Sequence, residues 1–336
     1  MKKCLIVPYF GKFPNYFQLT LNSCGNNLDF DWLIFTDNQE KYNYPSNVKV
    51  YNMSFKEFKT LIQNKLKKYI EKISLEVPYK LCDYKVTYGY VLNEYLKEYD
   101  WWGYCDFDII FGKLSNFITN DLLSRYDKLF VFGHLTLFRN TEEINTLFLK
   151  KYNGEKLYKK YLEVDNICVF DELWRDSINN IFESYNKKIF YKNYSADIYH
   201  RSVDFKEVIL DLENKKYKID KKYKGIYLYN KGRIIKVFRH KKRIIENEYL
   251  YIHLQKRKMN YNHITLKEDC FKIIPNSFEN LEIDLEKINY KNFYKIKRIK
   301  LNKDYIVKKI KYSYLVKRFK TIIKSIKKRI IYIKGV

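Results

Sequence analysis

The sequence has few cysteines, and their spacing limits the kinds of site that the chain can carry. The six are scattered, at Cys4, Cys24, Cys82, Cys105, Cys168 and Cys270. This pattern argues against a zinc ribbon and a disulfide framework, and it fits a reduced cytosolic compartment. No uncharged apolar run approaches the length needed to span a bilayer. The apolar opening from Cys4 meets Pro8 too soon for a signal peptide, so we expect a first strand there.

Acidic residues are scarce relative to basic ones, and the imbalance is concentrated near the end of the chain. The 65 Lys and Arg against 39 Asp and Glu give a net charge of +26. From Lys287 onward, 18 basic residues face Asp304 alone, so 18 minus 1 leaves +17 for this tail and +9 for the body. An excess of this size suggests a polyanionic partner. No nucleic-acid motif accompanies the charge, so we do not expect nucleic acid to be that partner.

The tail also carries an apolar stripe. Its members recur at roughly helical spacing between lysines and comprise Ile306, Ile310, Leu315, Phe319, Ile322, Ile323, Ile326 and Ile330. This pattern predicts a basic amphipathic helix on an anionic membrane surface, where each basic side chain contributes about 1 kcal/mol. The alternative is an ordinary solvated helix that docks on the body by its apolar stripe.

The body reads as an α/β domain. Apolar runs at 4–7, 32–35, 48–51, 101–111 and 129–132 predict strands, and helical spacing at 15–24 lies between the first two. Ser54 and Glu57 form a capping-box pattern that predicts a helix through Ile70, and apolar residues at helical spacing in 88–96 predict another after residue 85. The apolar runs on either side of residues 230–232 predict a hairpin. We therefore expect a mostly parallel central sheet flanked by helices, with the loop at 8–11 and Asp37 at one edge. A nucleotide would bind at that edge.

An acidic pair follows the most aromatic of these strands. In Tyr104-Cys105-Asp106-Phe107-Asp108 a strand would place Asp106 and Asp108 on one face and Phe107 on the other. Two neighbouring carboxylates are tolerated at a strand end when a divalent ion such as Mg²⁺ or Mn²⁺ bridges them, and that ion then holds a diphosphate. The alternative is a pair of solvated residues at the mouth of a strand.

Two later motifs are further candidates. Asp171 and Glu172 lie at an expected helix start, where the helix dipole alone favours acidic residues; the functional reading is a base or a sugar-hydroxyl ligand. His253 ends an apolar strand that runs into Lys256, in a chain with 5 histidines. A lone histidine is more often a core residue, but this one lies at a polar transition.

Together these stretches resemble GT-A glycosyltransferases, and more narrowly a bacterial family from capsule and lipopolysaccharide gene clusters. The likeness covers about residues 1–259 and leaves out the tail. It is carried by 7–11, 34–38, 80–85, 104–108, Gly133-His134, 170–172 and 252–257.

The resemblance implies a site. Asp106 and Asp108 would bind Mn²⁺ or Mg²⁺ with His253, and Lys256 would neutralise the leaving phosphate. If the reaction inverts configuration, Asp171 or Glu172 is the base; if it retains configuration, the same residues hold donor-sugar hydroxyls. The implied nucleotide contacts come from Pro8, Tyr9, Asp37, Phe107, Gly133 and His134, with Lys80 and Asp83 closing the other side.

The resulting expectation is a hexosyltransferase-type enzyme that moves a sugar from a nucleotide-diphosphate donor, UDP-linked, to a surface polysaccharide or lipid-linked glycan. We expect a GT-A domain at 1–285, with a nucleotide-binding half at 1–135 and an acceptor half at 136–285. The tail at 286–336 would hold the protein on the cytoplasmic face of the cell membrane. The alternatives are a nucleotidyltransferase on a similar fold and a non-catalytic basic membrane or RNA adaptor. Phosphatases of the haloacid-dehalogenase type also use an Asp-x-Asp motif, but they have Thr or a similar residue two positions after it. This chain has Ile110 there, which argues against that class.

Overall fold

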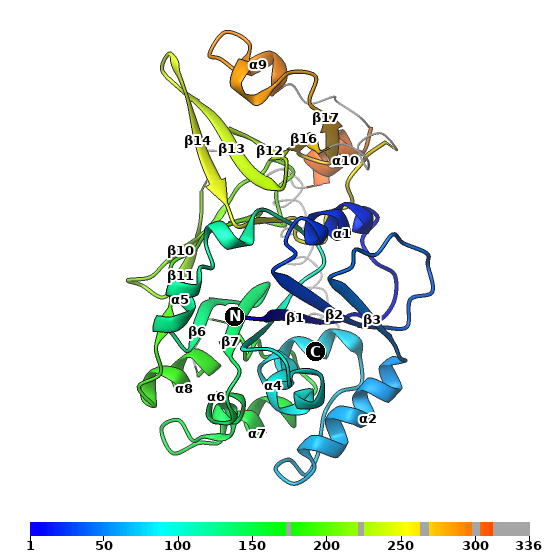
Figure 1. The fold of residues 1–336 in the computed structure, drawn as a ribbon, viewed down its shortest axis with the longest axis vertical. Coiled ribbons are helices and arrows are strands. Elements are labelled where there is room, and N and C mark those ends of the chain that lie inside the picture. Colours follow the sequence, from blue (N-terminus) through cyan, green and yellow to red (C-terminus); the bar gives the residue numbers. More distant parts are fainter. Residues whose placement is uncertain (173–175, 221–224, 263–268, 298–302, 312–336) are drawn as a thin grey trace, which may run out of the picture.

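A seven-stranded sheet runs through the middle of the molecule in the computed structural model (Figure 1). The structure describes residues 1–336 except 173–175, 221–224, 263–268, 298–302 and 312–336. The strand order is β3-β2-β1-β4-β7-β6-β8, and within this sheet only β7 runs against the others. The strands are β1 (Lys3–Pro8), β2 (Phe30–Thr36), β3 (Val48–Asn52), β4 (Trp101–Cys105), β6 (Lys128–Phe132), β7 (Leu135–Arg139) and β8 (Ile189–Phe190). The predicted α/β class with a mostly parallel, Rossmann-like sheet is confirmed.

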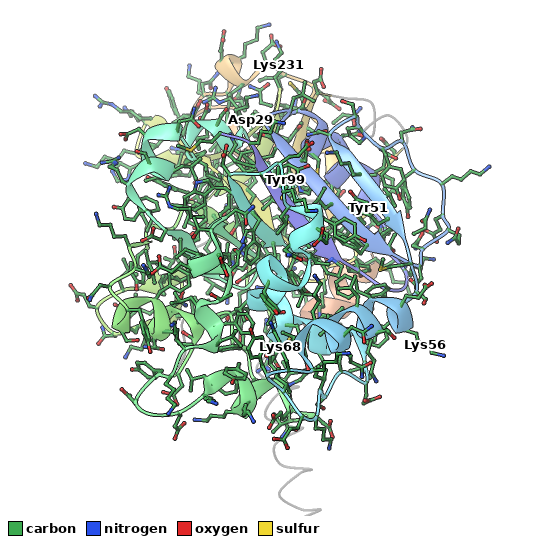
Figure 2. All side chains as sticks on the ribbon, turned by 60° about the horizontal axis from the view of Figure 1, so that its bottom comes forward. Asp29, Tyr51, Lys56, Lys68, Tyr99 and Lys231 are labelled. Atoms are coloured by element: carbon green, nitrogen blue, oxygen red, sulfur yellow. The ribbon has the colours of Figure 1, made fainter. Side chains whose placement is uncertain are left out.

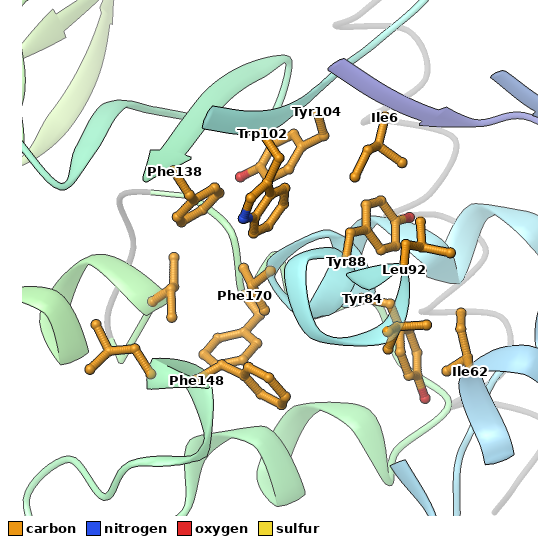
Figure 3. Packing of buried hydrophobic residues seen from close by; sticks show 14 of the residues in the cluster. Ile6, Ile62, Tyr84, Tyr88, Leu92, Trp102, Tyr104, Phe138, Phe148 and Phe170 are labelled. Carbon is orange, nitrogen blue, oxygen red and sulfur yellow. The ribbon is translucent and has the colours of Figure 1, made fainter. Parts of the chain in front are cut away.

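Helices and aromatic side chains cover both faces of this sheet. Side chains alternate along β4, so that Trp102 and Tyr104 enter one core cluster while Trp101 and Cys105 enter the other. The first cluster lies under α2 (Phe55–Leu66) and α4 (Tyr88–Val91), with Trp102 stacked on Phe138 at 4.6 Å between ring centroids (Figure 3). The second lies under α1 (Phe17–Gly25) and α5 (Asn120–Arg125). Strands buried on both faces explain why their sequences are continuous apolar runs.

The remaining helices are short. On the α2 side of the sheet are η1 (Pro78–Lys80), α3 (Leu81–Tyr84), η2 (Lys85–Thr87), η3 (Asn93–Tyr95), α6 (Glu142–Asn145), η5 (Leu147–Leu149), α7 (Leu157–Leu162) and α8 (Ile178–Ser184). Elsewhere are η4 (Leu114–Asn116), η6 (Leu285–Lys287), α9 (Phe293–Ile296) and α10 (Lys303–Lys311).

A second, five-stranded sheet lies beyond α1, at the top of Figure 1. It is antiparallel throughout, in the order β14-β13-β12-β16-β17, from β12 (Gly225–Asn230), β13 (Arg233–His240), β14 (Arg243–Tyr249), β16 (Cys270–Ile274) and β17 (Ser277–Asn280). The hairpin predicted around residues 230–232 is confirmed, and Lys231 and Gly232 both have positive φ, as a two-residue hairpin turn requires. A further pair, β10 (Val208–Asp211) and β11 (Lys216–Ile219), forms a separate two-stranded sheet.

The predicted strand over 101–111 is wrong as a single element. The chain leaves the central sheet after Cys105, and β5 (Ile109–Phe111) pairs instead with β15 (Tyr251–His253). Strand β15 also pairs with β9 (Ser195–Asp197), which gives a small three-stranded sheet. Asp106 and Asp108 therefore lie in the connection between two sheets and not on one face of a strand.

Other local expectations are partly corrected. The Ser54–Glu57 capping box is confirmed, but its helix ends at Leu66. The helix expected after residue 85 is broken into short α and 3₁₀ turns. Within this stretch the Thr87 hydroxyl donates to the Tyr84 carbonyl at 2.8 Å, a bond that competes with helical backbone hydrogen bonds. Asp171 lies in a turn, and the following helix, α8, begins at Ile178 with Ser177 as its cap.

Part of the basic tail is described. Helix α10 docks on the body through Tyr305, which is buried and donates to the Asp204 carboxylate at 3.0 Å, while Ile306, Val307 and Ile310 are exposed. The predicted stripe from Leu315 onward lies outside the described residues. Charged side chains such as Lys56 and Lys231 stand on the outer surface (Figure 2). Among the described helices, none has the length and apolar composition that crossing a membrane would require.

Candidate active site

Strand pairing brings the acidic pair and the late histidine together. His253 is in register with Ile109 of β5 on one side and with Asp197 of β9 on the other. Because Asp108 directly precedes β5, its carboxylate lies beside the imidazole, with Oδ1 3.1 Å from His253 Nε2. Asp106 Oδ2 is 3.8 Å from the same nitrogen, and Asp197 Oδ1 is 2.8 Å from Nδ1.

Asp106, Asp108 and His253 form a group that fits a divalent cation. One ligand atom from each lies within 4.8 Å of the others. Two carboxylates and one imidazole suit Mn²⁺ or Mg²⁺, which prefer hard oxygen ligands and keep positions open for waters or phosphates. The Asp108 and His253 side chains are 10% and 6% exposed, whereas Asp106 is 36% exposed. Two of the three ligands are therefore buried, and solvent reaches the group at Asp106.

The charges of this group support that assignment. Burial alone would raise the pKa of Asp108, but the charge and hydrogen bond of His253 and the backbone N–H of Lys256 together lower it to about 2. Burial also opposes the charged form of His253, yet Asp108 and Asp197 raise its pKa well above 6.5. A proton on His253 thus offsets the charges of the Asp108 and Asp197 carboxylates on either side of it.

The turn after His253 wraps around Asp108. The Leu254 N–H donates to the Asp108 carbonyl at 2.8 Å, and the Lys256 N–H donates to Asp108 Oδ2 at 2.5 Å. Gln255 and Lys256 both have positive φ, at 54° and 57°, a conformation that costs a side-chain-bearing residue about 1 kcal/mol. The same turn leaves the Lys256 ammonium exposed, 3.9 Å from the centroid of the Tyr79 ring.

Lys85 joins the acidic pair to Asp171, a role that the sequence did not reveal. Its ammonium lies 2.9 Å from Asp106 Oδ1, donates to the Gly133 carbonyl at 2.6 Å and is 3.9 Å from Asp171 Oδ2. Lys85 belongs to the 80–85 stretch that carried the resemblance, but no periodic or charge pattern marked it within that stretch.

The carboxyl group of Asp171 is buried without hydrogen bonds from the described residues to offset the loss of solvent. The residue is 1% exposed, and neither of its carboxylate oxygens has a hydrogen-bond partner among the described residues. Burial is the main cause that raises its pKa, to about 8, although Lys85 opposes the rise. Glu172 is half-buried beside it. A buried carboxyl group of this kind has capacity left for a ligand.

Gly133 allows these carboxylates to approach the site. A Cβ at this position would lie 2.5 Å from Glu172 Oε1 and 3.0 Å from Asp171 Oδ2.

The next residue, His134, is buried, and its Nδ1 is 2.7 Å from the Tyr251 hydroxyl. Burial and the charge of His253 lower the pKa of His134 to about 4. We expected His134 to contact the nucleotide. The structure corrects this, because the buried imidazole of His134 packs against His253, at 4.5 Å between ring centroids.

The expected meeting of the first two loops is confirmed. Asp37 Oδ1 accepts a 2.8 Å hydrogen bond from the Gly11 N–H, which fixes the loop that begins at Pro8. Tyr9 is half-buried and packs against Phe107, at 5.6 Å between ring centroids. Phe107 itself is 2% exposed, so its side chain anchors the acidic connection in the core and does not face a ligand.

Lys80 and Asp83 are placed differently from the expectation. Both are buried, and the Lys80 ammonium donates to Asp83 Oδ2 at 2.7 Å and to the carbonyls of Tyr161 and Asn166. These bonds use its three N–H groups. Asp83 in turn accepts the backbone N–H groups of Cys168 and Phe170. The pair therefore does not close a nucleotide site; it fastens the segment that carries Asp171.

Removing one member of this pair should destabilise the fold. Lys80→Met would leave the Asp83 charge buried, and broken pairs of this kind cost about 3–5 kcal/mol. We expect the free energy of unfolding in urea to fall by that amount. A loss below about 1 kcal/mol would contradict the assignment, and Lys68→Met, at an exposed position, serves as the control.

Comparisons with known proteins place the chain in a family. No curated protein matches it. Among solved structures, the galactosyltransferase LgtC, in complex with donor and acceptor sugar analogues, is similar over 59% of this chain and 76% of its own, with a TM-score of 0.34 and 9% sequence identity. A family model matches residues 5–282, and its description is a family of unknown function, DUF6625. The chain belongs to that family.

Proposed function

We propose that the protein is a metal-dependent glycosyltransferase of the GT-A type. It would move a sugar from a nucleotide-diphosphate donor, a UDP-sugar, to a glycan or lipid-linked glycan. The observation that carries the proposal is the group of Asp106, Asp108 and His253 next to the buried carboxyl group of Asp171, which has no hydrogen-bond partner among the described residues. One end of the site suits the cation of a diphosphate, and the other offers acceptor oxygens to hydroxyl groups.

The leaving-group end would consist of the acidic pair and two lysines. A Mn²⁺ or Mg²⁺ ion held by Asp106, Asp108 and His253 would stabilise the negative charge that develops on the diphosphate. The backbone N–H of Lys256 is bound to Asp108, and its side chain is exposed, with the ammonium over the Tyr79 ring. In the proposal this flexible side chain would turn to pair with a phosphate oxygen. Lys85, bound to Asp106, lies between this end and Asp171.

The sugar end would be recognised by Asp171. A hydroxyl group can donate to a carboxyl oxygen and accept from an ammonium at the same time, and Asp171 with Lys85 presents both groups, 3.9 Å apart. Such a contact would remove the desolvation cost that Asp171 now carries. Asp171 thus binds a donor-sugar or acceptor hydroxyl, with Glu172 beside it and Gly133 leaving room for both.

The proposal is tested by incubating the protein with nucleotide sugars, Mn²⁺ and short glycans while UDP release and product mass are measured. We expect UDP and a glycan that is heavier by one sugar. Release of pyrophosphate with a new sugar nucleotide would show a nucleotidyltransferase instead. Failure of every nucleotide sugar to raise the melting temperature in the presence of Mn²⁺, together with no turnover, would contradict an enzyme of either class.

The tail at 286–336 is proposed to bring the transferase domain, 1–285, to lipid-linked acceptors at the cytoplasmic face of the membrane. The described part supports this: α10 is docked by Tyr305 and exposes Ile306, Val307 and Ile310 among lysines. Residues 312–336 add 8 basic residues and no acidic one.

Deletion of residues 312–336 should separate membrane binding from catalysis. The docked helix α10 and all proposed site residues are kept, so turnover on a water-soluble acceptor should stay within about twofold of wild type. Binding to anionic vesicles should fall at least tenfold, and wild-type binding should weaken with added salt as charges are screened. Equal vesicle binding by the truncated and full chains would favour the docked-helix alternative.

A further inference from the structure

Two candidate metal groups share His253. One contains Asp106 and Asp108, and the other contains His134 and Asp197. The first faces Nε2 of the imidazole and the second faces Nδ1. A neutral imidazole has one unprotonated nitrogen, so it can bind an ion on one side only. Which of the two nitrogens of His253 carries the proton therefore decides which group can hold the metal.

Asp197 lies where it can fix the position of the proton on His253. Its Oδ1 lies 2.8 Å from His253 Nδ1 and also accepts a 2.8 Å hydrogen bond from Gln255 Nε2. The backbone holds this geometry from both sides, because Asp197 and His253 are in register between β9 and β15 and the Ile198 N–H donates to the His253 carbonyl at 3.0 Å. A carboxylate in this position keeps the proton on Nδ1 when Nε2 gives up its own proton to bind an ion.

We propose that Asp197 is a positioning residue: it holds the Nδ1–H tautomer of His253, so that Nε2 binds the divalent cation together with Asp106 and Asp108. This inference rests on the proposed metal-dependent transfer and assigns the His134–Asp197 side an orienting role. Carboxylates that bind the second nitrogen of a metal-ligating histidine commonly change metal affinity 10- to 100-fold.

The two sides of His253 differ in ways that favour this arrangement. On the Asp197 side, His134 Nδ1 is engaged with the Tyr251 hydroxyl, and His134 Nε2 is 3.9 Å from Asp197 Oδ2. His134 and Asp197 are 6% and 8% exposed, so this side has no exposed carboxylate comparable to Asp106, whose side chain is 36% exposed. Two imidazoles and one carboxylate also suit iron or zinc, whereas the Asp106–Asp108 side offers hard oxygens and an opening.

The first experiment is a nitrogen-15 spectrum of the histidine side chains of the full chain, saturated with diamagnetic Mg²⁺. The chain has 5 histidines, so the spectrum is simple, and the His253→Ala variant identifies the signals of His253. We expect a proton on Nδ1, shifted downfield by its bond to Asp197, and a metal-shifted Nε2 without a proton. A metal-shifted Nδ1 with a protonated Nε2 would overturn the inference, since Asp197 would then be a ligand.

The second experiment measures Mn²⁺ affinity by electron paramagnetic resonance. Asp197→Ala should weaken binding 10- to 100-fold and raise the Mn²⁺ concentration needed for half-maximal turnover, with little change in kcat at saturating Mn²⁺. Asp197→Asn keeps an acceptor for Nδ1–H, so it should recover most of the affinity and the wild-type tautomer. Asp31→Asn, which removes a paired carboxylate elsewhere in the body, should bind Mn²⁺ as wild type does.

The outcomes separate this inference from the proposed function. Wild-type affinity in Asp197→Ala, with its His253 signals unchanged, would overturn the positioning role and leave the transferase proposal intact. A wild-type protein that binds neither Mn²⁺ nor Mg²⁺ would overturn both. If Asp197→Ala does not fold, the wild-type spectrum and Asp197→Asn still decide the question.

Discussion

Asp108→Asn is expected to abolish sugar transfer while leaving the fold intact. Asp108 contacts both His253 and the Lys256 N–H, and an amide can satisfy both, with its oxygen accepting from Lys256 and its NH₂ donating to a neutral Nε2. Only the charge is lost. Because metal stabilisation of a leaving group contributes several kcal/mol, we expect turnover to fall more than about 10³-fold, which corresponds to about 4 kcal/mol. Asp106→Asn should behave in the same way.

The matched control for this prediction lies at the other end of the same strand. Asp100 precedes β4 and accepts the Lys2 N–H at 2.7 Å, whereas Asp106 follows β4. Asp100→Asn should keep turnover and Mn²⁺ affinity near wild type. The measurements are UDP release over a Mn²⁺ titration and the melting temperature of each variant. Near-full turnover by either Asp106→Asn or Asp108→Asn at limiting Mn²⁺ would refute the metal assignment.

Elements with a strong local signal could be predicted from the sequence. The strands β1 and β2 are largely apolar runs because both sheet faces are covered, and Ser54 with Glu57 marks the start of α2 by mutual hydrogen bonds. The hairpin at Lys231-Gly232 has its turn residues between two apolar strands. Each of these features depends on neighbours within a few positions.

The break after Cys105 could not be predicted, because distant pairing determines it. Aromatic and apolar residues continue to Phe111, but β4 finds its partner in β7 and β5 finds its partner in β15, about 140 positions later. Asp197 and Lys85 were missed for the same reason. Each is a single charged residue without a repeating pattern, and only the register of β9 or the packing of the turns near residue 85 brings it to the acidic pair.

The position of Asp171 shows the same limit in another way. Its acidic neighbour and the apolar residues around it suggested the first turn of a helix. The structure instead holds this segment as a turn, through the backbone N–H groups of Cys168 and Phe170 bound to Asp83. A buried aspartate some 85 positions earlier thus overrides the local preference and turns Asp171 into the core, toward Lys85.

Asp171→Asn is expected to abolish transfer and to stabilise the protein. The carboxyl group is buried, lacks a hydrogen-bond partner among the described residues and has a pKa of about 8, so at neutral pH the fold carries a desolvated acid that an unfolded chain would ionise. Because the amide cannot ionise in the unfolded chain, the substitution should raise the free energy of unfolding at neutral pH by about 1–3 kcal/mol. Turnover should fall at least 10²-fold, because the sugar hydroxyl loses the carboxyl group that binds it.

The pH dependence of this stabilisation gives the sharper test. Because the folded pKa of Asp171 lies above its unfolded value, near 3.8, its contribution to stability is complete below pH 4 and is lost as the pH rises toward 8. Urea unfolding should therefore show variant and wild type converging near pH 4 and the variant more stable near pH 8. Asp83→Asn, equally buried but paired with Lys80, should be destabilised. An Asp171→Asn protein that loses stability at pH 8, or that still transfers sugar, would show a structural carboxylate and remove Asp171 from the site.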